Sequence, residues 1–186
     1  MSELIIDFIT SLDGYGAAEG WPGWWGLEGP EYFAWLEEQP ERTLVMGSTT
    51  YRVMSGFAEQ GEPGTDVLAG IPKIVFSNSL EEPLTWPNTR LVRGDAVEAM
   101  RALKAEDSER FSTIGSVALS RSFLSAGLAD RFRVVIFPVI TGATGSERIY
   151  DGYPDVALQM VDHRTLDGGT QMVEYVPTVL TGPPGR

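Results

Sequence analysis

TIGSVALSRSFLSAGLADRFRVVIF, residues 113–137, is the stretch that decides the fold class of this chain. A short apolar strand over Phe111 to Ile114 ends at Gly115-Ser116, two small residues that open a helix. Gly127 follows that helix as a left-handed cap, and a further strand is expected from Arg131 to Phe137. A strand, a crossover helix and a second strand form the unit from which parallel sheets are built. The stretch therefore predicts an α/β protein.

The same alternation of strands and helices occupies the first two-thirds of the chain. Apolar runs predict strands over Leu4 to Ile9, Thr43 to Met46, Lys73 to Ser77 and Arg90 to Val92. Helices are expected over 30–38, over 49–54 and from Asp95, with Glu98 as its capping-box partner, to about 105. Residues 157–176 predict a hairpin that turns at Asp167-Gly168. We expect one domain over 1–177, with a mainly parallel sheet ending in this antiparallel hairpin, and a disordered tail over 178–186.

Composition excludes several classes of function. The formal net charge of −12 argues against binding to nucleic acid or to an anionic membrane. The chain has no cysteine, which excludes disulfides and thiolate metal sites, and its scattered carboxylates show no metal-ligand spacing. No apolar run approaches the roughly 20 residues of a membrane span. The start, MSELIIDFIT, lacks the basic region of a signal peptide, so we expect a cytoplasmic protein.

Three of the expected strands end in small or hydroxyl-bearing residues, which are Gly47-Ser48-Thr49-Thr50, Ser77-Asn78-Ser79 and Gly115-Ser116. Taken singly, each set is most simply a helix cap or a turn. The carboxyl ends of parallel strands lie at one edge of a sheet, where such folds bind their ligands. Free amides at a helix start also attract anions. The three sets together therefore predict a phosphate-bearing ligand, although neither G-x-G-x-x-G nor a Walker sequence is present.

The order of these motifs resembles the dihydrofolate reductase-like superfamily, in the branch that contains the reductase domain of riboflavin biosynthesis. The resemblance runs over residues 4 to 177 and is carried by TSLDGYGA (10–17), LVMGSTTY (44–51), IVFSNS (74–79) and TIGSVALSRSFLSAGLADRFRVVIFPVITGATGSERIY (113–150). It implies a three-layer α/β/α fold and hydride transfer from NADPH. It also implies a homodimer.

The resemblance assigns cofactor contacts to each of the three turns. Gly47, Ser48, Thr49 and Thr50 would contact the pyrophosphate and the adenosine side of NADPH. Ser77 and Asn78 would lie near the ribose 2′-phosphate. Gly115 and Ser116, with the amides of Val117, Ala118 and Leu119, would hold the pyrophosphate and flank the nicotinamide. The chain departs from many relatives in having Ser48 in place of a cation and Gly115-Ser116 in place of Gly-Gly, where a cis peptide before serine would be costly.

On the substrate side, two carboxylates are candidate proton donors. Asp13 follows the first strand, and Glu31 opens the first expected helix. Their simpler roles are a turn residue for Asp13 and a helix-dipole partner for Glu31. Trp24 and Trp25 lie in the long loop between these acids and would either stack on a flat heterocycle or anchor the loop. The lone His163 is expected to be an exposed strand residue.

The expected function is reduction of a small heterocycle, either a pterin or an aminopyrimidine, with NADPH as cofactor. One candidate substrate is 5-amino-6-(5-phosphoribosylamino)uracil, against which stand the absence of a deaminase domain and of a Lys/Arg cluster for its phosphate. Two alternatives stay open. The chain could be a non-catalytic module that binds a nucleotide or small molecule, or a flavin-binding protein, which would be yellow when purified.

Overall fold

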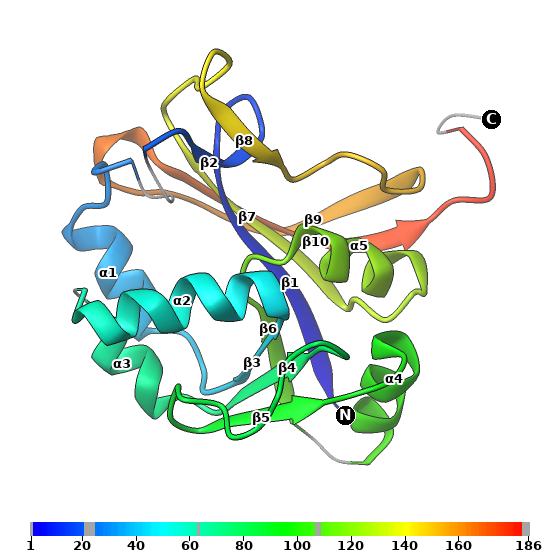
Figure 1. Cartoon of the computed structure of the whole chain (residues 1–186). Helices are drawn as coiled ribbons and strands as arrows, with labels where there is room; N and C mark the ends of the chain where they lie inside the picture. Colours follow the sequence, from blue (N-terminus) through cyan, green and yellow to red (C-terminus); the bar gives the residue numbers. More distant parts are fainter. Residues whose placement is uncertain (1, 21–24, 63, 107–108, 184–186) are drawn as a thin grey trace.

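One eight-stranded sheet organises the protein, whose computed structural model describes residues 2–20, 25–62, 64–106 and 109–183. The strand order is β5-β4-β3-β6-β1-β7-β10-β9 (Figure 1). The parallel strands are β1 (Glu3–Ser11), β3 (Thr43–Gly47), β4 (Lys73–Phe76), β5 (Thr89–Val92), β6 (Arg110–Thr113) and β7 (Arg131–Phe137). The last two strands, β9 (Val156–Thr165) and β10 (Gln171–Val179), are antiparallel and complete the sheet. The predicted α/β class, with its terminal hairpin, is confirmed.

Among the residues that the structure describes, five α-helices cover the two faces of the sheet (Figure 1). On one face lie α1 (Pro30–Glu37), α2 (Ser48–Gln60) and α3 (Thr65–Gly70), and on the other α4 (Ala96–Glu106) and α5 (Val117–Ser125). Strands β3 and β4 alternate their side chains between the two layers, so Leu44 packs with the α2 side and Val45 with the α4 and α5 side. A sheet covered on both faces needs apolar residues at successive positions, which explains the uninterrupted apolar runs in these strands.

Helix α2 is longer than the sequence indicates, and α3 is a helix that the sequence did not indicate. The helix expected over 49–54 runs from Ser48 to Gln60, because Tyr51 and Ser55 form a buried stripe and Gly61 closes the helix in the left-handed conformation. The polar stretch that follows contains the short helix α3. Helix α4 begins as predicted, with the Asp95 carboxylate accepting hydrogen bonds from the amides of Val97 and Glu98.

A second, two-stranded sheet pairs β2 (Tyr15–Ala18) with β8 (Gly145–Arg148), which the sequence did not indicate. The two strands lie far apart in the chain and are short, so neither shows a clear alternation of polar and apolar residues. Strand β10 continues to Val179 and takes in the first two residues of the segment expected as a tail. In the part of the chain that the structure describes, no helix is both long enough and apolar enough to cross a membrane.

Candidate functional site

Helices α2 and α5 begin side by side at the carboxyl edge of the sheet. Strands β3 and β6 are hydrogen-bonded neighbours, and the Ile114 amide extends their pairing by donating to the Val45 carbonyl at 3.1 Å. Helix α2 follows β3 directly at Ser48, and α5 follows β6 at Val117. Two of the three turns predicted to bind phosphate are thus brought together.

The hydroxyl group of Ser116 joins these two turns. Its oxygen accepts a hydrogen bond from the Gly47 amide at 2.9 Å and lies 2.7 Å from Oγ1 of Thr50, to which it donates. Gly115 and Ser116 are both left-handed, with φ values of 54° and 60°. Their peptide bond is trans, since the only cis bond among the described residues joins Glu82 to Pro83. A serine is therefore compatible with this turn, and its hydroxyl is the hydrogen-bond partner of the Gly47 amide.

Both helix starts leave amides free to bind an anion. The N-cap of α2 is Gly47, which has no side chain to cap the helix, and the side chain of Ser116, the N-cap of α5, makes no cap hydrogen bond to its own helix. The first three amides of an α-helix have no carbonyl partner within the helix, and here these belong to Ser48, Thr49, Thr50, Val117, Ala118 and Leu119. The positive ends of two helix dipoles converge with them, which suits a pyrophosphate. The amide of Gly47 is not free, because it donates a hydrogen bond to the Ser116 hydroxyl.

The third turn, at the end of β4, uses its polar side chains internally. The Ser77 hydroxyl accepts hydrogen bonds from the amides of Ser79 and Leu80 at 3.1 and 3.2 Å. The Asn78 carboxamide bridges to Gly94, whose amide donates to its Oδ1 at 2.7 Å. Both side chains therefore stabilise the turn. That they bind the ribose 2′-phosphate directly stays a prediction.

Arg93 is the cation beside this turn, and sequence reasoning missed it. Its Nη2 donates to the Leu80 carbonyl at 2.8 Å, and its side chain is exposed. Arg93 directly follows β5, so a cation at a strand end was visible in the sequence, but the pairing of β5 with β4 that places it beside the Ser77 turn was not.

Asp13 lies at the carboxyl end of β1 and is held as a carboxylate. It accepts hydrogen bonds from the Ser11 hydroxyl at 2.6 Å and from the Thr141 amide at 3.1 Å. The Ser11 hydrogen bond is the main reason that the pKa of Asp13 is lowered from its ordinary value. An acid stabilised in its ionised form is a poor proton donor at neutral pH, so this environment favours an anchoring role for Asp13.

Glu31 lies in the first turn of α1, where its side chain is exposed. Its amide donates to Oδ2 of Asp167, in the turn of the terminal hairpin, at 3.2 Å. Asp167 thus caps α1 from a distant part of the chain. A side chain at Gly29 would lie within 2.6 Å of the Asp167 carboxylate, so only glycine allows this approach.

Trp25 packs into the protein, and Trp24 lies outside the described residues. The Trp25 ring is 5.8 Å from that of Phe137, the last residue of β7, and only 9% of Trp25 is exposed. Tyr32 packs on the same Phe137 at 5.7 Å. These contacts support the anchoring interpretation of Trp25, and they place residues 25–32 over the end of β7.

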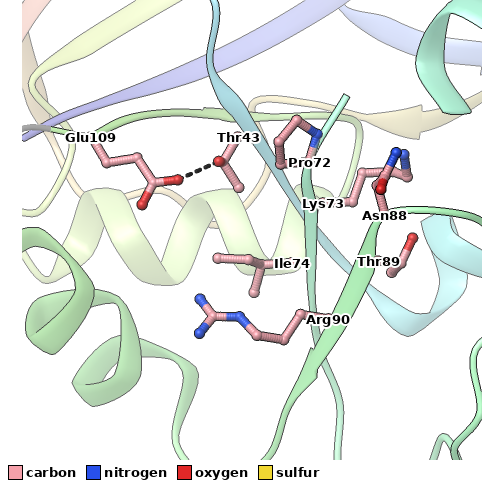
Figure 2. A pocket seen from close by; sticks show the side chains of 8 residues that line it. All are labelled: Thr43, Pro72, Lys73, Ile74, Asn88, Thr89, Arg90 and Glu109. Carbon is pink, nitrogen blue, oxygen red and sulfur yellow. Dashed lines mark hydrogen bonds between the residues drawn. The ribbon is translucent and has the colours of Figure 1, made fainter. Parts of the chain in front are cut away.

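The pocket in Figure 2 lies at the opposite, amino-terminal edge of the sheet and is a different feature. It has a volume of about 400 Å³ and is lined by Thr43, Pro72, Lys73, Ile74, Asn88, Thr89, Arg90 and Glu109. Lys73 is buried there, with Nζ donating to the carbonyls of Leu68 and Ile71 at 2.6 Å each and lying 4.6 Å from the Trp86 ring. Burial lowers the pKa of Lys73 to about 8. These bonds tie the end of α3 to β4.

Metal ligation has no geometric support in the described ranges, which hold no group of three or more His, Asp or Glu placed to bind an ion. His163 is exposed on β9, as expected.

Comparison with known proteins identifies the family. The chain is 24% identical over 179 residues to YyaP, an uncharacterised protein of Bacillus subtilis strain 168, with 92% of this chain and 93% of YyaP aligned. A protein of Shewanella sp. PV-4 that is provisionally assigned to riboflavin biosynthesis matches with a TM-score of 0.74 and 22% identity, covering 95% of this chain and 99% of that one. Dihydrofolate reductase of Enterococcus faecalis, solved with NADP(H), matches with a TM-score of 0.62 and 15% identity, covering 95% and 96%. Residues 2–172 match the model of the RibD C-terminal domain, and the chain therefore belongs to that family.

Proposed function

We propose that the protein is an NADPH-dependent reductase that transfers hydride to a small heterocycle, a pterin or an aminopyrimidine. The observation that carries this proposal is the junction of α2 and α5, two helix starts that the Ser116 hydroxyl joins and that together present six amides. A dinucleotide pyrophosphate is the ligand that such a pair of helix starts suits best. Family membership supports the same ligand.

Several described residues offer groups that suit the phosphates of NADPH. The α2 and α5 amides would hold the pyrophosphate, and the hydroxyls of Ser48 and Thr49, which have no hydrogen-bond partner among the described residues, would add donors. Arg93 would face the ribose 2′-phosphate, supplying the charge that Ser48 lacks. When bound, the nicotinamide would supply the hydride, and the protein would orient it and exclude water.

The two candidate acids, Asp13 and Glu31, differ in whether they would donate a proton to the substrate. Asp13 would stay ionised and fix the end of β1, because Ser11 and Thr141 hold its carboxylate. Glu31, exposed in the first turn of α1, would be the side chain able to supply a proton, directly or through water.

We also propose a cytoplasmic homodimer. Strand β9 is an edge strand with no partner on its outer side within the described residues, and it exposes Leu158, Met160 and Val161. A second copy could cover this surface, as edge strands commonly require. Sedimentation of the wild-type protein and of Met160→Lys tests it, because a dimer through β9 predicts monomers for the variant.

The reductase proposal is tested by following NADPH oxidation with oxidised pterins and aminopyrimidines as acceptors. Turnover that falls at least tenfold in Glu31→Gln, with KM for NADPH unchanged, supports both the reaction and the role of Glu31. Tight NADPH binding without oxidation on any acceptor would instead favour a non-catalytic binding module of the same fold.

A further inference from the structure

We propose that Asp167, in the turn of the terminal hairpin, is a positioning residue that fixes the first turn of α1 and, with it, Glu31. The proposal rests on the proposed function, in which Glu31 supplies the proton. Asp167 lies 136 residues away from Glu31 in the chain and acts on the reaction only through the helix that carries Glu31.

The first turn of α1 has no side-chain cap of its own. The N-cap residue is Gly29, which has no side chain, and the first helical residue is Pro30, which has no N–H group. The amides of Tyr32 and Phe33 donate to the Gly29 carbonyl at 3.1 and 3.3 Å. The amide of Glu31 therefore needs an acceptor from outside the helix.

Asp167 supplies this acceptor. Its Oδ2 accepts a hydrogen bond from the Glu31 amide at 3.2 Å. A side chain at the N-cap commonly accepts from the amide of the second helical residue, which is Glu31 in α1. An added Cβ at Gly29 would lie within 2.6 Å of the Asp167 carboxylate, so this carboxylate occupies the space of the missing N-cap side chain. Its negative charge also suits the positive end of the helix dipole.

The hairpin holds α1 along its whole length. Leu166, next to Asp167, is buried in the same apolar cluster as Tyr32 and Trp35 of α1. Beyond the last turn of the helix, Nη1 of Arg164 binds Oε2 of the C-cap residue Glu38 at 2.6 Å. The hairpin thus contacts both ends of α1 and its buried face, and Asp167 is the contact nearest to Glu31.

The position of a proton donor strongly affects the rate of a reaction, because a small misplacement weakens proton transfer. Loss of the Asp167 hydrogen bond would loosen the first turn of α1, where Glu31 lies. The amides proposed to bind the pyrophosphate belong to α2 and α5, so they would keep their positions. We therefore expect an effect on kcat and not on the KM for NADPH.

The test uses the full chain and measures kcat at saturating NADPH, with 7,8-dihydropterin and 5-amino-6-(5-phosphoribosylamino)uracil as acceptors. We expect Asp167→Ala to lower kcat about tenfold and to leave the KM for NADPH unchanged. Asp167→Asn keeps an acceptor oxygen and should stay within about threefold of the wild type. In the double variant Gly29→Ser/Asp167→Ala, a serine hydroxyl at the N-cap replaces the distant carboxylate, so most of the lost kcat should return.

A second measurement needs no turnover. Hydrogen exchange at the Glu31 amide, followed by NMR, should be about tenfold faster in Asp167→Ala and should slow again in Gly29→Ser/Asp167→Ala. Asp95→Ala is the matched control, because the Asp95 carboxylate caps α4 through the amides of Val97 and Glu98. It removes a comparable cap elsewhere in the fold and should leave both kcat and exchange at Glu31 unchanged.

Wild-type kcat in Asp167→Ala overturns the proposal. So does an equal loss of kcat in Asp95→Ala, or a Gly29→Ser/Asp167→Ala protein that stays as slow as Asp167→Ala. A wild-type protein that reduces neither acceptor removes the proposed function instead. Exchange at Glu31 then still decides whether Asp167 fixes the first turn of α1, and an unchanged rate in Asp167→Ala would show that it does not.

Discussion

The Ser116 hydroxyl lies 2.9 Å from the Gly47 amide, 69 residues away in the chain, and 2.7 Å from Oγ1 of Thr50, 66 residues away, so one side chain links the starts of two helices. This link fixes the position of the free amides of α2 relative to those of α5. Preorganised donors bind an anion without first having to be ordered, so this relation is expected to determine nucleotide affinity.

Replacing Ser116 with alanine should therefore weaken NADPH binding about tenfold and destabilise the fold by roughly 1–2 kcal/mol, because the Gly47 amide and the Thr50 hydroxyl lose their partner. Fluorescence titration and urea unfolding measure the two effects. Ser122→Ala is the control, since the Ser122 hydroxyl donates to the Ala118 carbonyl of its own helix. A Ser116→Ala protein with wild-type affinity for NADPH would contradict the bracing role.

Gly115→Ala should destabilise the protein for two separable reasons. The residue has φ of 54°, and an added Cβ would lie 3.2 Å from Oγ1 and 3.3 Å from Cγ2 of Thr50. A left-handed alanine costs about 1 kcal/mol, and the close contacts add to it. In the double variant Gly115→Ala/Thr50→Ala these contacts are absent. The losses of unfolding free energy in the two single variants should therefore add up to more than the loss in the double variant. Strict additivity in this double-mutant cycle would show that Thr50 does not crowd the turn.

Arg93→Ala should raise the Kd for NADPH about five- to tenfold and leave that for NADH unchanged, because only NADPH carries the 2′-phosphate. Arg93 binds the Leu80 carbonyl beside the Ser77–Ser79 turn. Arg90→Ala is the control, since Arg90 lies on β5, the strand just before Arg93, but lines the pocket at the amino-terminal edge. Parallel losses for both nucleotides would mean that Arg93 acts on the fold of the turn and not on the phosphate.

Lys73 should make stability rise with pH on the alkaline side. Its pKa is about 8 in the folded protein, below the ordinary value of 10.5, because the ammonium group is buried. Between these pH values the unfolded chain holds a proton at Lys73 that the folded chain has released, so the free energy of unfolding increases with pH over that window, by about 3 kcal/mol.

Urea unfolding of the wild type and of Lys73→Met at several pH values between 7 and 11 would show this increase in the wild type alone. Lys104→Met is the comparison, since Lys104 keeps a counter-charge in Asp130. An identical pH profile for the wild type and Lys73→Met would rule out the linkage.

The sequence predicted the local features of this protein better than its long-range ones. Each of the three turns was visible because a buried apolar run changes to small hydroxyl residues within one or two positions, at Gly47, Ser77 and Gly115. Their arrival at one edge follows from the adjacent order β4-β3-β6, which the chain order alone does not specify.

Side-chain partners between distant segments were beyond sequence reasoning. The Ser116–Thr50 bond, the cap that Asp167 provides to α1 and the pairing of β2 with β8 all join residues with no local signal for each other. Asp13 was a plausible acid by position, and only its two hydrogen bonds, one of them from the distant Thr141, indicate an anchored carboxylate.

The proposal that α2 and α5 together hold the cofactor pyrophosphate is tested most directly by backbone amide chemical shifts in an NMR titration with NADPH. We expect saturable binding, with the largest shifts at the amides of Ser48, Thr49, Val117 and Ala118. Absence of binding, or saturable binding whose shifts centre on the amino-terminal pocket around Lys73 and Arg90, would contradict the proposal.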